Sequence, residues 1–341
     1  MPFIRPDDLR WQSLLSRASH DVYHLPGYCT LEAALMQGTA LAWYHEVDGV
    51  QCLIPLICRN INGSGFHHDL VSPYGYPGLL ANQALSEGMT SSFLDLFHRE
   101  AGEQGYVSSF IRLNPLSNPW KLTSQESFRQ WMHGGTISID LNRPTVTINA
   151  GFSENHRRNL RKLSKEGYQA TVNDWNTIAD FITAYRQTMT RRQAHPYYFF
   201  PDSYFDSLQQ LLAEQLVYIA ITDRIGQFVA GGIFTCFGEV MQYHLGATSN
   251  TAVHLSPSKL MIDEAIRFGI AAGAGTLHLG GGLGGSTSDG LFRFKRGFGD
   301  SFHPFSSLRF IHNPQVYNLL RKESQVIDPQ TDYFPEYRRT P

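Results

Sequence analysis

The same order of predicted elements occurs in both halves of the chain, and this repetition most strongly limits the folds that the sequence can adopt. Each half contains a strand hairpin, a loop, a helix that ends at a glycine and a strand that begins directly after it. The helices are expected over 85–104 and 259–272, and the strands after them over 106–113 and 276–279. The pattern predicts two copies of one mixed α/β unit, with a coincidence of common elements as the alternative.

The length and composition of the chain agree with two folded domains. With 341 residues, the chain exceeds the usual size of a single hydrophobic core. We expect an N-terminal domain over 1–145 and a C-terminal domain over 146–341. A hydrophobic content of 42% with 17% charged residues indicates an ordered globular protein. The formal net charge of -2 gives no overall attraction to DNA, so any polyanion site has to be a local patch.

Several patterns that would indicate other classes of protein are absent from the sequence. The four cysteines have no zinc-type spacing, and there is neither a signal peptide nor an apolar stretch of about 18 residues. Phosphate-loop, nucleophile-elbow and zinc-helix motifs are missing as well. We therefore expect a cytoplasmic protein with reduced thiols, no metal and no membrane span, which can still contact the inner face of the membrane peripherally.

A strongly basic helix is predicted between the two repeats, over 154–166. Ser153 can cap its first turn and Gly167 can end it. Its cations form one stripe, which consists of Arg157, Arg158, Arg161, Lys162 and Lys165. In a chain of almost zero net charge, this concentration favours contact with phosphate groups, and the alternative is a solvated helix face.

A glycine-rich segment follows the last predicted strand of the second repeat. Positions 280–285 hold five glycines, which allow backbone N–H groups to approach a ligand closely. The cations Arg293, Lys295 and Arg296 come soon afterwards, so the segment is suited to an anion or a polar acyl group; the alternative is a flexible loop before an edge strand. Three of the glycines have dinucleotide-loop spacing, but 292–296 has the alternation of a strand and not of a helix, which argues against a dinucleotide site.

Five short motifs together resemble the FemABX family, the GNAT-related peptidoglycan bridge aminoacyltransferases, and the broader set of FemAB-like proteins. They are Ser72-Pro73-Tyr74-Gly75, Arg157-Arg158-Asn159-Leu160-Arg161-Lys162, Tyr243-His244-Leu245-Gly246-Ala247, Ser256-Pro257-Ser258-Lys259-Leu260 and Phe294-Lys295-Arg296-Gly297-Phe298-Gly299. The resemblance extends over about residues 40 to 311 and is strongest from 150 to 300. It implies an α/β fold with mixed sheets in two tandem GNAT-like domains.

The resemblance also implies an activity. Family members move an aminoacyl group from a charged tRNA ester to an amine of a peptidoglycan precursor, and relatives linked to polysaccharide synthesis use other acyl donors and acceptors. Lys295 corresponds to the lysine of the family's Phe-Lys-x-x-Phe-Gly motif, which lies near the reacting centre. We expect substrate contacts from these motifs and their neighbours: Tyr74, Tyr76, Arg157, Arg158, Arg161, Lys162, Tyr243, Ser256, Lys259, Gly280, Gly281, Arg293 and Phe294.

Acyl transfer to an amine needs particular groups in such a site. The reaction passes through a tetrahedral oxyanion, which one well-placed donor stabilises by roughly 3–4 kcal/mol. Lys295 or the N–H groups of 280–282 can supply that donor. The amine also has to lose a proton, and His244 and Asp289 are the candidate bases.

The turn before the helix over 259–272 bears on the identity of the acyl donor. GNAT enzymes that use coenzyme A hold its pyrophosphate there with a glycine-containing turn, whereas 253–259 contains no glycine and Pro257 lacks an N–H group. Lys259 can still place a cation at this position. These features favour an aminoacyl-tRNA or another donor over acetyl-CoA, although the sequence predicts no long helical arm of the kind associated with tRNA in some family members.

We therefore expect an acyl or aminoacyl transferase that forms an amide on a cell-envelope precursor, linked to a nucleotide or a lipid. Its donor, aminoacyl-tRNA or acyl-CoA, is a co-substrate, and no cofactor is expected besides it. Two alternatives stay open. One is a CoA-dependent N-acyltransferase that acts on a nucleotide sugar or a small amine, and the other is a non-catalytic module of the same fold that binds a precursor or RNA.

Overall fold

In the computed structural model, the chain divides into two units. Unit 1 contains Met1–His133 and Pro304–Pro341, and unit 2 contains Gly134–His303. The division therefore lies before the boundary expected at 145/146, and the C-terminal segment belongs to unit 1. The reason is the long strand β13 (Ser301–Ile311), which pairs with β6 of unit 1 from Ser307 onward. The structure describes residues 1–61, 66–117, 122, 125–282, 289–299, 301–324 and 333–339.

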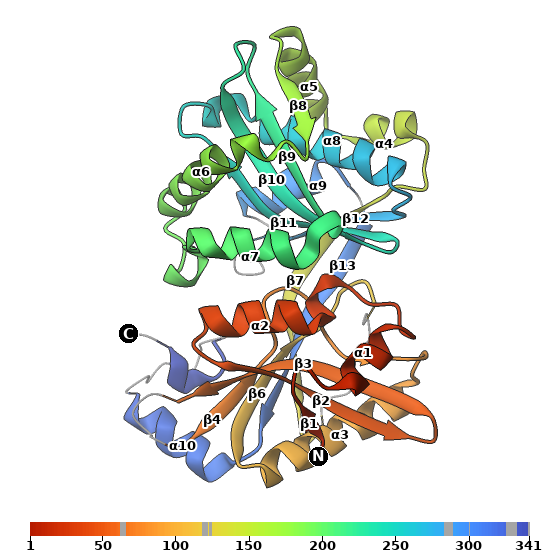
Figure 1. Ribbon diagram of the computed structural model, residues 1–341, viewed down its shortest axis with the longest axis vertical. Helices are drawn as coiled ribbons and strands as arrows, with labels where there is room; N and C mark the ends of the chain where they lie inside the picture. Colours follow the sequence, from red (N-terminus) through yellow and green to blue (C-terminus); the bar gives the residue numbers. More distant parts are fainter. Residues whose placement is uncertain are drawn as a thin grey trace. The chain divides into compact units, whose positions relative to one another are not determined.

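Unit 1 is built on a sheet with the strand order β1-β2-β3-β4-β6-β13 (Figure 1). Its strands before β13 are β1 (Phe3–Ile4), β2 (Thr39–Val47), β3 (Val50–Asn60), β4 (His68–Val71), β5 (Leu80–Ala81) and β6 (Tyr106–Arg112). β5 pairs with β3 beside this order. The predicted turn at Asp48 and Gly49 joins β2 to β3, and both residues have positive φ, as a tight hairpin requires.

Helices cover both faces of the sheet of unit 1. The helices are α1 (Leu9–Leu15), α2 (Pro26–Leu35), α3 (Glu87–Glu103) and α10 (Pro314–Glu323). Neighbouring residues of β3 point to opposite faces, as alternation in a strand requires. Leu53 packs in the cluster of α1 and α2, whereas Ile54 packs in the cluster of α3. The short helix η7 (Glu336–Arg338) packs beside α10 through Tyr337 and Tyr317.

In unit 2 the strands follow the order β7-β12-β11-β10-β9-β8. Its strands are β7 (Arg129–Asp140, which begins in unit 1), β8 (Gln169–Val172), β9 (Leu216–Thr222), β10 (Phe228–Phe237), β11 (Val240–Thr248) and β12 (Thr276–Gly281). Its helices are α4 (Thr145–Gly151), α5 (Glu154–Lys165), α6 (Ile178–Arg191), α7 (Asp202–Leu212), α8 (Ser258–Ala271) and α9 (Gly290–Arg296). None of the helices described in either unit is long and apolar enough to cross a bilayer.

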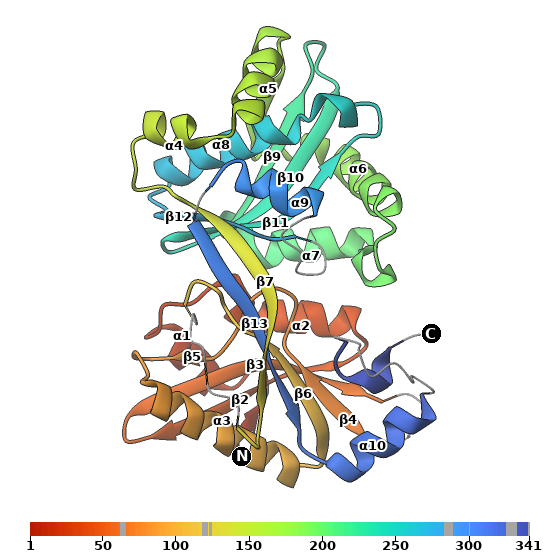
Figure 2. The ribbon, with the colours of Figure 1, turned by 180° about the vertical axis from the view of Figure 1, so that it is seen from behind.

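The helices of unit 2 form a layer on each face of the sheet. α6 and α7 lie on one face, and α8 and α9 lie on the other (Figures 1 and 2). β9 shows this division, because Tyr218 packs against Phe181 of α6, while Val217 and Ile219 belong to the same core cluster as Ile262 of α8. Each face of the sheet is therefore covered by its own packed side chains.

The two units contain the same run of strands, as the repeated pattern in the sequence predicts. β2-β3-β4-β6 in unit 1 and β9-β10-β11-β12 in unit 2 are neighbours in that order. In each run the first strands are antiparallel, and the last two are parallel and flank a helix in the sequence, α3 or α8. The prediction of a mixed α/β fold with two tandem units is confirmed.

The segment 292–296 is a helix and not the predicted strand. Asp289 caps the first turn of α9 by accepting hydrogen bonds from the N–H groups of Leu291 and Phe292. Phe292 and Lys295 are buried at a spacing of one helical turn, which the sequence alternation concealed. The strand argument against a dinucleotide site was therefore wrong, and the remaining glycine of that spacing, Gly285, lies outside the described residues.

Candidate active site

The strands β11 and β12 separate in the middle of unit 2, and the opening between them is the centre of the candidate site. Their parallel pairing joins Val240–Gln242 to Thr276–His278, and the described residues show no β11–β12 pairing beyond it. Both strands change register just after this point, β11 against β10 and β12 against β7. Bulges of this kind bend a strand. The edges that face each other thereby offer backbone N–H and C=O groups to a ligand.

Lys295 of α9 lies at this opening. Its Nζ donates a hydrogen bond of 2.7 Å to the carbonyl oxygen of Gly281 at the end of β12, and lies 5.7 Å from the ring centroid of Tyr243 on β11. The residue is only 7% exposed. Burial lowers the pKa of Lys295 to about 7, while the negative charge of Asp289 acts in the opposite direction. A lysine that exchanges its proton near neutral pH is suited to acid–base chemistry.

Asp289 places a carboxylate at the same end of β12. Its Oδ1 accepts the N–H groups of Leu291 and Phe292 at 2.7 and 3.1 Å, whereas its buried Oδ2 has no hydrogen-bond partner among the described residues. The carboxylate lies so close to Gly282 that a Cβ atom there would be 1.8 Å from Oδ2. Oδ2 is therefore a buried acceptor whose hydrogen-bonding capacity the described residues leave unused.

The basic helix α5 is anchored to both α9 and the start of α8. His156 on its buried side makes a hydrogen bond of 2.9 Å from Nε2 to the carbonyl oxygen of Phe294, one residue before Lys295. On the α8 side, Lys259 donates a hydrogen bond of 2.6 Å to Oδ1 of Asn155. Burial and the charge of Arg158 lower the pKa of Lys259. The helix predicted to bind phosphate and the helix that carries the predicted catalytic Lys295 are thus in direct contact.

Comparisons with known proteins agree with this geometry. The sequence profile described as an Acetyltransferase (GNAT) domain matches residues 150–296. The crystal structure of FemX superposes with a TM-score of 0.70 and 13% identity, covering 94% of this chain and 99% of FemX. Residues 150–296 thus match a GNAT acetyltransferase domain, and the whole chain shares the fold of FemX. The resemblance predicted from the sequence is confirmed for the fold, and the domain match agrees with the predicted acyltransferase class.

Two further solved structures share the fold of this chain. L-PGS from Bacillus licheniformis has a TM-score of 0.55 and 14% identity, with coverage of 91% of this chain and 93% of that chain. The C-terminal domain of a protein described as a lysylphosphatidylglycerol synthetase, from Agrobacterium fabrum, has a TM-score of 0.55 and 11% identity, with coverage of 93% and 95%. No curated protein sequence matches the chain.

His244, predicted as a candidate base, does not lie with Lys295 at the opening between β11 and β12. Its Nε2 makes a hydrogen bond of 3.1 Å with the hydroxyl group of Tyr204 on α7, whereas Tyr243 and α9 pack on the α8 side of the sheet. Burial lowers the pKa of His244 to about 4. The structure therefore indicates a packing role for His244, and Asp289 is the predicted base that lies beside Lys295.

The other predicted contacts are distributed over several places. The stripe on α5, from Arg157 to Lys165, is exposed along its whole length. Arg293 is exposed on α9, while Phe294 packs against the ring of His156. Gly280 has a φ of 74°, which favours glycine, and it lies with Gly281 at the end of β12.

Two predicted tyrosines belong to unit 1. Tyr74 is tied to α2, because its carbonyl oxygen accepts a hydrogen bond from Tyr28 and its N–H group donates one to Glu32. The ring of Tyr76 contacts that of Phe305 edge-on. Ser256, the last predicted contact, lies in unit 2 before α8 with a φ of 53°, in the left-handed region.

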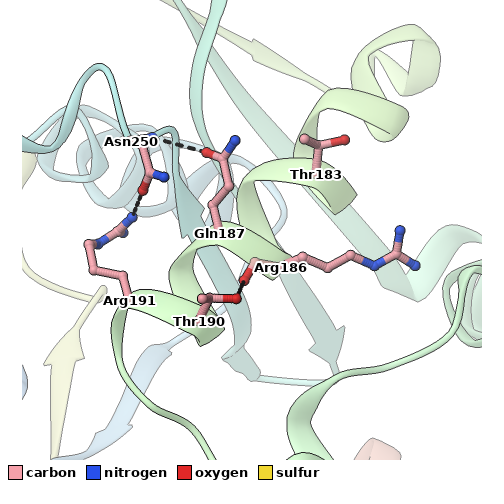
Figure 3. A pocket seen from close by; sticks show the side chains of 6 residues that line it. All are labelled: Thr183, Arg186, Gln187, Thr190, Arg191 and Asn250. Atoms are coloured by element: carbon pink, nitrogen blue, oxygen red, sulfur yellow. Dashed lines mark hydrogen bonds between the residues drawn. The ribbon is translucent and has the colours of Figure 1, made fainter.

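An open cavity of about 570 Å³ lies at the C-terminal part of α6 and was not predicted from the sequence. Figure 3 shows Arg186, Gln187 and Arg191 projecting from the helix around it, with Asn250 from the turn after β11. Asn250 accepts a hydrogen bond from Arg191, and its N–H group donates one of 3.1 Å to Gln187. The sequence feature that could have indicated this cavity is the arginine pair Arg191-Arg192. Such a pair is a weak indication, because arginines on an amphipathic helix usually lie on a solvated face.

A buried polar pair at the last β11–β12 contact was also missed. His278 on β12 makes a hydrogen bond of 2.6 Å from Nδ1 to Oε1 of Gln242 on β11. Burial lowers the pKa of His278 to about 3, and the charge of Lys295 adds to this effect. The neutral His278 therefore holds the two strands together at the point where they begin to separate.

Proposed function

We propose that this FemABX-like protein transfers an acyl or aminoacyl group from an activated ester to an amine of a cell-envelope precursor. The observation that carries the proposal is Lys295, a buried amine at the opening between β11 and β12. The likeness in fold to FemX and to a protein named for an aminoacylated lipid, lysylphosphatidylglycerol, supports aminoacyl transfer in particular. A buried lysine ammonium can stabilise the oxyanion of the tetrahedral intermediate through which acyl transfer passes.

The reaction needs one proton to leave the amine and one to reach the leaving group. The amine nitrogen attacks the carbonyl carbon, and a C–N bond forms while the carbonyl oxygen becomes an oxyanion. The C–O bond to the leaving group then breaks, and the leaving oxygen takes a proton from the ammonium form of Lys295. The surplus proton on the new amide nitrogen restores that ammonium, so no proton is gained or lost overall. A pKa of about 7 allows Lys295 to give and take this proton at neutral pH.

Asp289 is the residue that we propose for orienting the amine. Its Oδ2 lies at the end of β12 without a hydrogen-bond partner in the described part of the chain, and its charge faces Lys295. A neutral amine can donate an N–H group to this oxygen and present its lone pair to the carbonyl carbon. Asp289 would then position the nucleophile while Lys295 serves the oxyanion and the leaving group.

The donor that we propose is an aminoacyl-tRNA. The exposed cations of α5 and the cavity with Arg186 and Arg191 in unit 2 suit a polyanion larger than coenzyme A. At the start of α8, Pro257 lacks an N–H group, and Nζ of Lys259 is bonded to Asn155. The acceptor is an envelope precursor linked to a nucleotide or a lipid, reached from the cytoplasm, and Tyr74 and Tyr76 are proposed to contact it.

A transfer assay with separate donors tests the proposal. Purified protein is incubated with envelope precursors and either radiolabelled aminoacyl-tRNA or radiolabelled acetyl-CoA, and label in an amide product is measured. We expect transfer from the tRNA, loss of transfer in Lys295→Met, and full transfer in Lys322→Met, which changes an exposed lysine of α10. Transfer from acetyl-CoA alone would support the N-acyltransferase alternative. Precursor binding without transfer from either donor would support a non-catalytic module.

A further inference from the structure

A second cationic cavity lies within unit 1. It has a volume of about 240 Å³ and lies between the sheet and residues 333–339. These residues, called the C-terminal segment below, lie beside β4 (Figures 1 and 2). Arg59, Arg112, Arg309 and Arg338 line it together with aromatic residues that include Phe110 and Phe334, and no acidic side chain lines it among the described residues. We propose that this cavity binds a phosphoryl group, and that it is a site separate from the acyl-transfer site of unit 2.

The carboxylate that these arginines contact in the described part of the chain is already fully engaged. Asp69 is completely buried and accepts hydrogen bonds from Nε and Nη2 of Arg59 at 3.0 and 3.2 Å. It also accepts two from Arg338, at 2.5 and 2.9 Å, and one from the hydroxyl group of Tyr337 at 3.0 Å. One negative charge therefore holds two arginines in place and fixes the C-terminal segment on β4.

The cavity retains positive charge after this pairing. The side chain of Arg112 donates a hydrogen bond of 3.2 Å to the carbonyl oxygen of Ser72, and its guanidinium lies 5.0 Å from the ring centroid of Phe110. Arg59, Arg112 and Arg338 against Asp69 leave a net charge of two, before Arg309 is counted. Like charges gathered in a partly buried cavity repel each other strongly, since water screens them poorly there. A dianion offsets this charge.

The shape of the site favours a phosphoryl group over a flat carboxylate. Arg59 and Arg338 approach from β3 and the C-terminal segment, and Arg112 approaches from β6. Guanidinium groups that converge from different elements match the oxygens of a tetrahedral phosphate, to which each can donate two N–H groups. The rings of Phe110 and Phe334 line the same cavity and offer apolar contact to the organic part of such a ligand. Both a phosphorylated substrate and free phosphate would present this chemistry.

Isothermal titration calorimetry of the full chain with inorganic pyrophosphate and, separately, inorganic phosphate tests this site. The informative variants are Arg112→Gln, which removes the charge without unpairing Asp69, and Arg112→Lys, which keeps the charge. Arg99→Gln on α3 is the matched control, because Arg99 is exposed in the same unit. We expect wild-type protein and Arg99→Gln to bind alike, and Arg112→Gln to bind about tenfold or more weakly, as for loss of a charge-assisted hydrogen bond. The salt slope of the affinity should also fall by about one.

The result does not depend on acyl transfer, because only binding is measured. Pyrophosphate binding without phosphate binding would indicate a diphosphate-bearing ligand, and binding of both would indicate a single phosphoryl group. Binding that is unchanged in Arg112→Gln but lost when Arg157 and Arg158 are reversed to Glu would overturn the proposal and assign the anion to α5. Absence of wild-type binding at millimolar concentration would overturn it as well. If Arg112→Gln does not fold, a several-fold loss in Arg112→Lys decides the question, since a point charge cannot replace the guanidinium fork.

Discussion

Replacing Lys295 by methionine should stabilise the protein at neutral and acidic pH while abolishing transfer. The lysine is 7% exposed, and the structure shows no salt bridge to it from the described residues. Methionine has a similar length and no charge, so it can fill the same space. The substitution removes the cost of burying an ammonium and loses one hydrogen bond to Gly281. The first effect is the larger one.

The size of this effect follows from the pKa of Lys295. Burial lowers that pKa from 10.5 to about 7, and at 1.36 kcal/mol per pH unit the difference corresponds to roughly 5 kcal/mol. Below pH 7 Lys295 is protonated in both the folded and the unfolded state, so the folded state bears the full free-energy cost of burying the ammonium. Between pH 7 and 10.5 the unfolded state binds more protons, and wild-type stability rises with pH. The lost hydrogen bond offsets about 1.5–3 kcal/mol of the gain in the variant.

Urea denaturation of wild type and Lys295→Met at pH 6 to 10 measures the difference in free energy of unfolding. We expect the variant to be more stable at pH 6, and its advantage to shrink by about 1.4 kcal/mol for each pH unit above 7. The other titrating groups are common to both proteins and cancel in this difference. Transfer by the wild type should decline as pH rises above 7, because the ammonium form is lost. A difference in stability that is independent of pH would refute the reasoning, since Lys295 would then keep an ordinary pKa.

Three further predictions concern neighbouring groups. Gly282→Ala should lower the rate of transfer at least about tenfold, because the added Cβ would lie 1.8 Å from the carboxylate of Asp289, which caps α9. Gly290→Ala, in open space on α9, is the control and should keep full activity. Equal rates in the two variants would contradict this prediction. His244→Asn should cost about 1–3 kcal/mol in urea denaturation and leave the pH profile of transfer unchanged, and a shifted profile would return this histidine to the chemistry. Arg157→Glu with Arg158→Glu should weaken binding of charged tRNA and reduce its dependence on salt in filter-binding titrations, and an unaltered salt slope would make α5 a solvated surface.

The architecture was predictable from the sequence because it depends on local signals that occur twice. The turn at Asp48 and Gly49, and the glycines that end α3 and α8, define the hairpin, helix and strand of each copy. The boundary between the units was not predictable, because it depends on the pairing of β13 with β6, two strands far apart in the sequence. Strand pairing over such a distance leaves no mark in the periodicity of either strand.

The site was predictable in part, for a similar reason. Lys295 was predicted through a motif, and Asp289 was predicted as a candidate base in the same segment. His244 was chosen for its residue type, and the sequence could not show that it contacts Tyr204 on the far side of the sheet. The arginine cavity of unit 1 was missed altogether, because its members come from β3, β6, β13 and the C-terminal segment. Residues that only the tertiary fold brings together carry no common sequence signal.

His156, the buried histidine of α5, links the helix that is proposed to bind the donor to the helix that carries Lys295. The helix α9 has only seven residues, which is too short for a helix to be stable without tertiary contacts. It nevertheless holds a lysine whose burial costs several kcal/mol, so its position depends on Asp289 at one end and on His156 near the other. His156 belongs to the helix whose exposed face is proposed to bind the donor phosphates. A shift of α5 on donor binding would therefore pass through the His156–Phe294 hydrogen bond to the residue next to Lys295, and the catalytic amine would be aligned when the donor is in place.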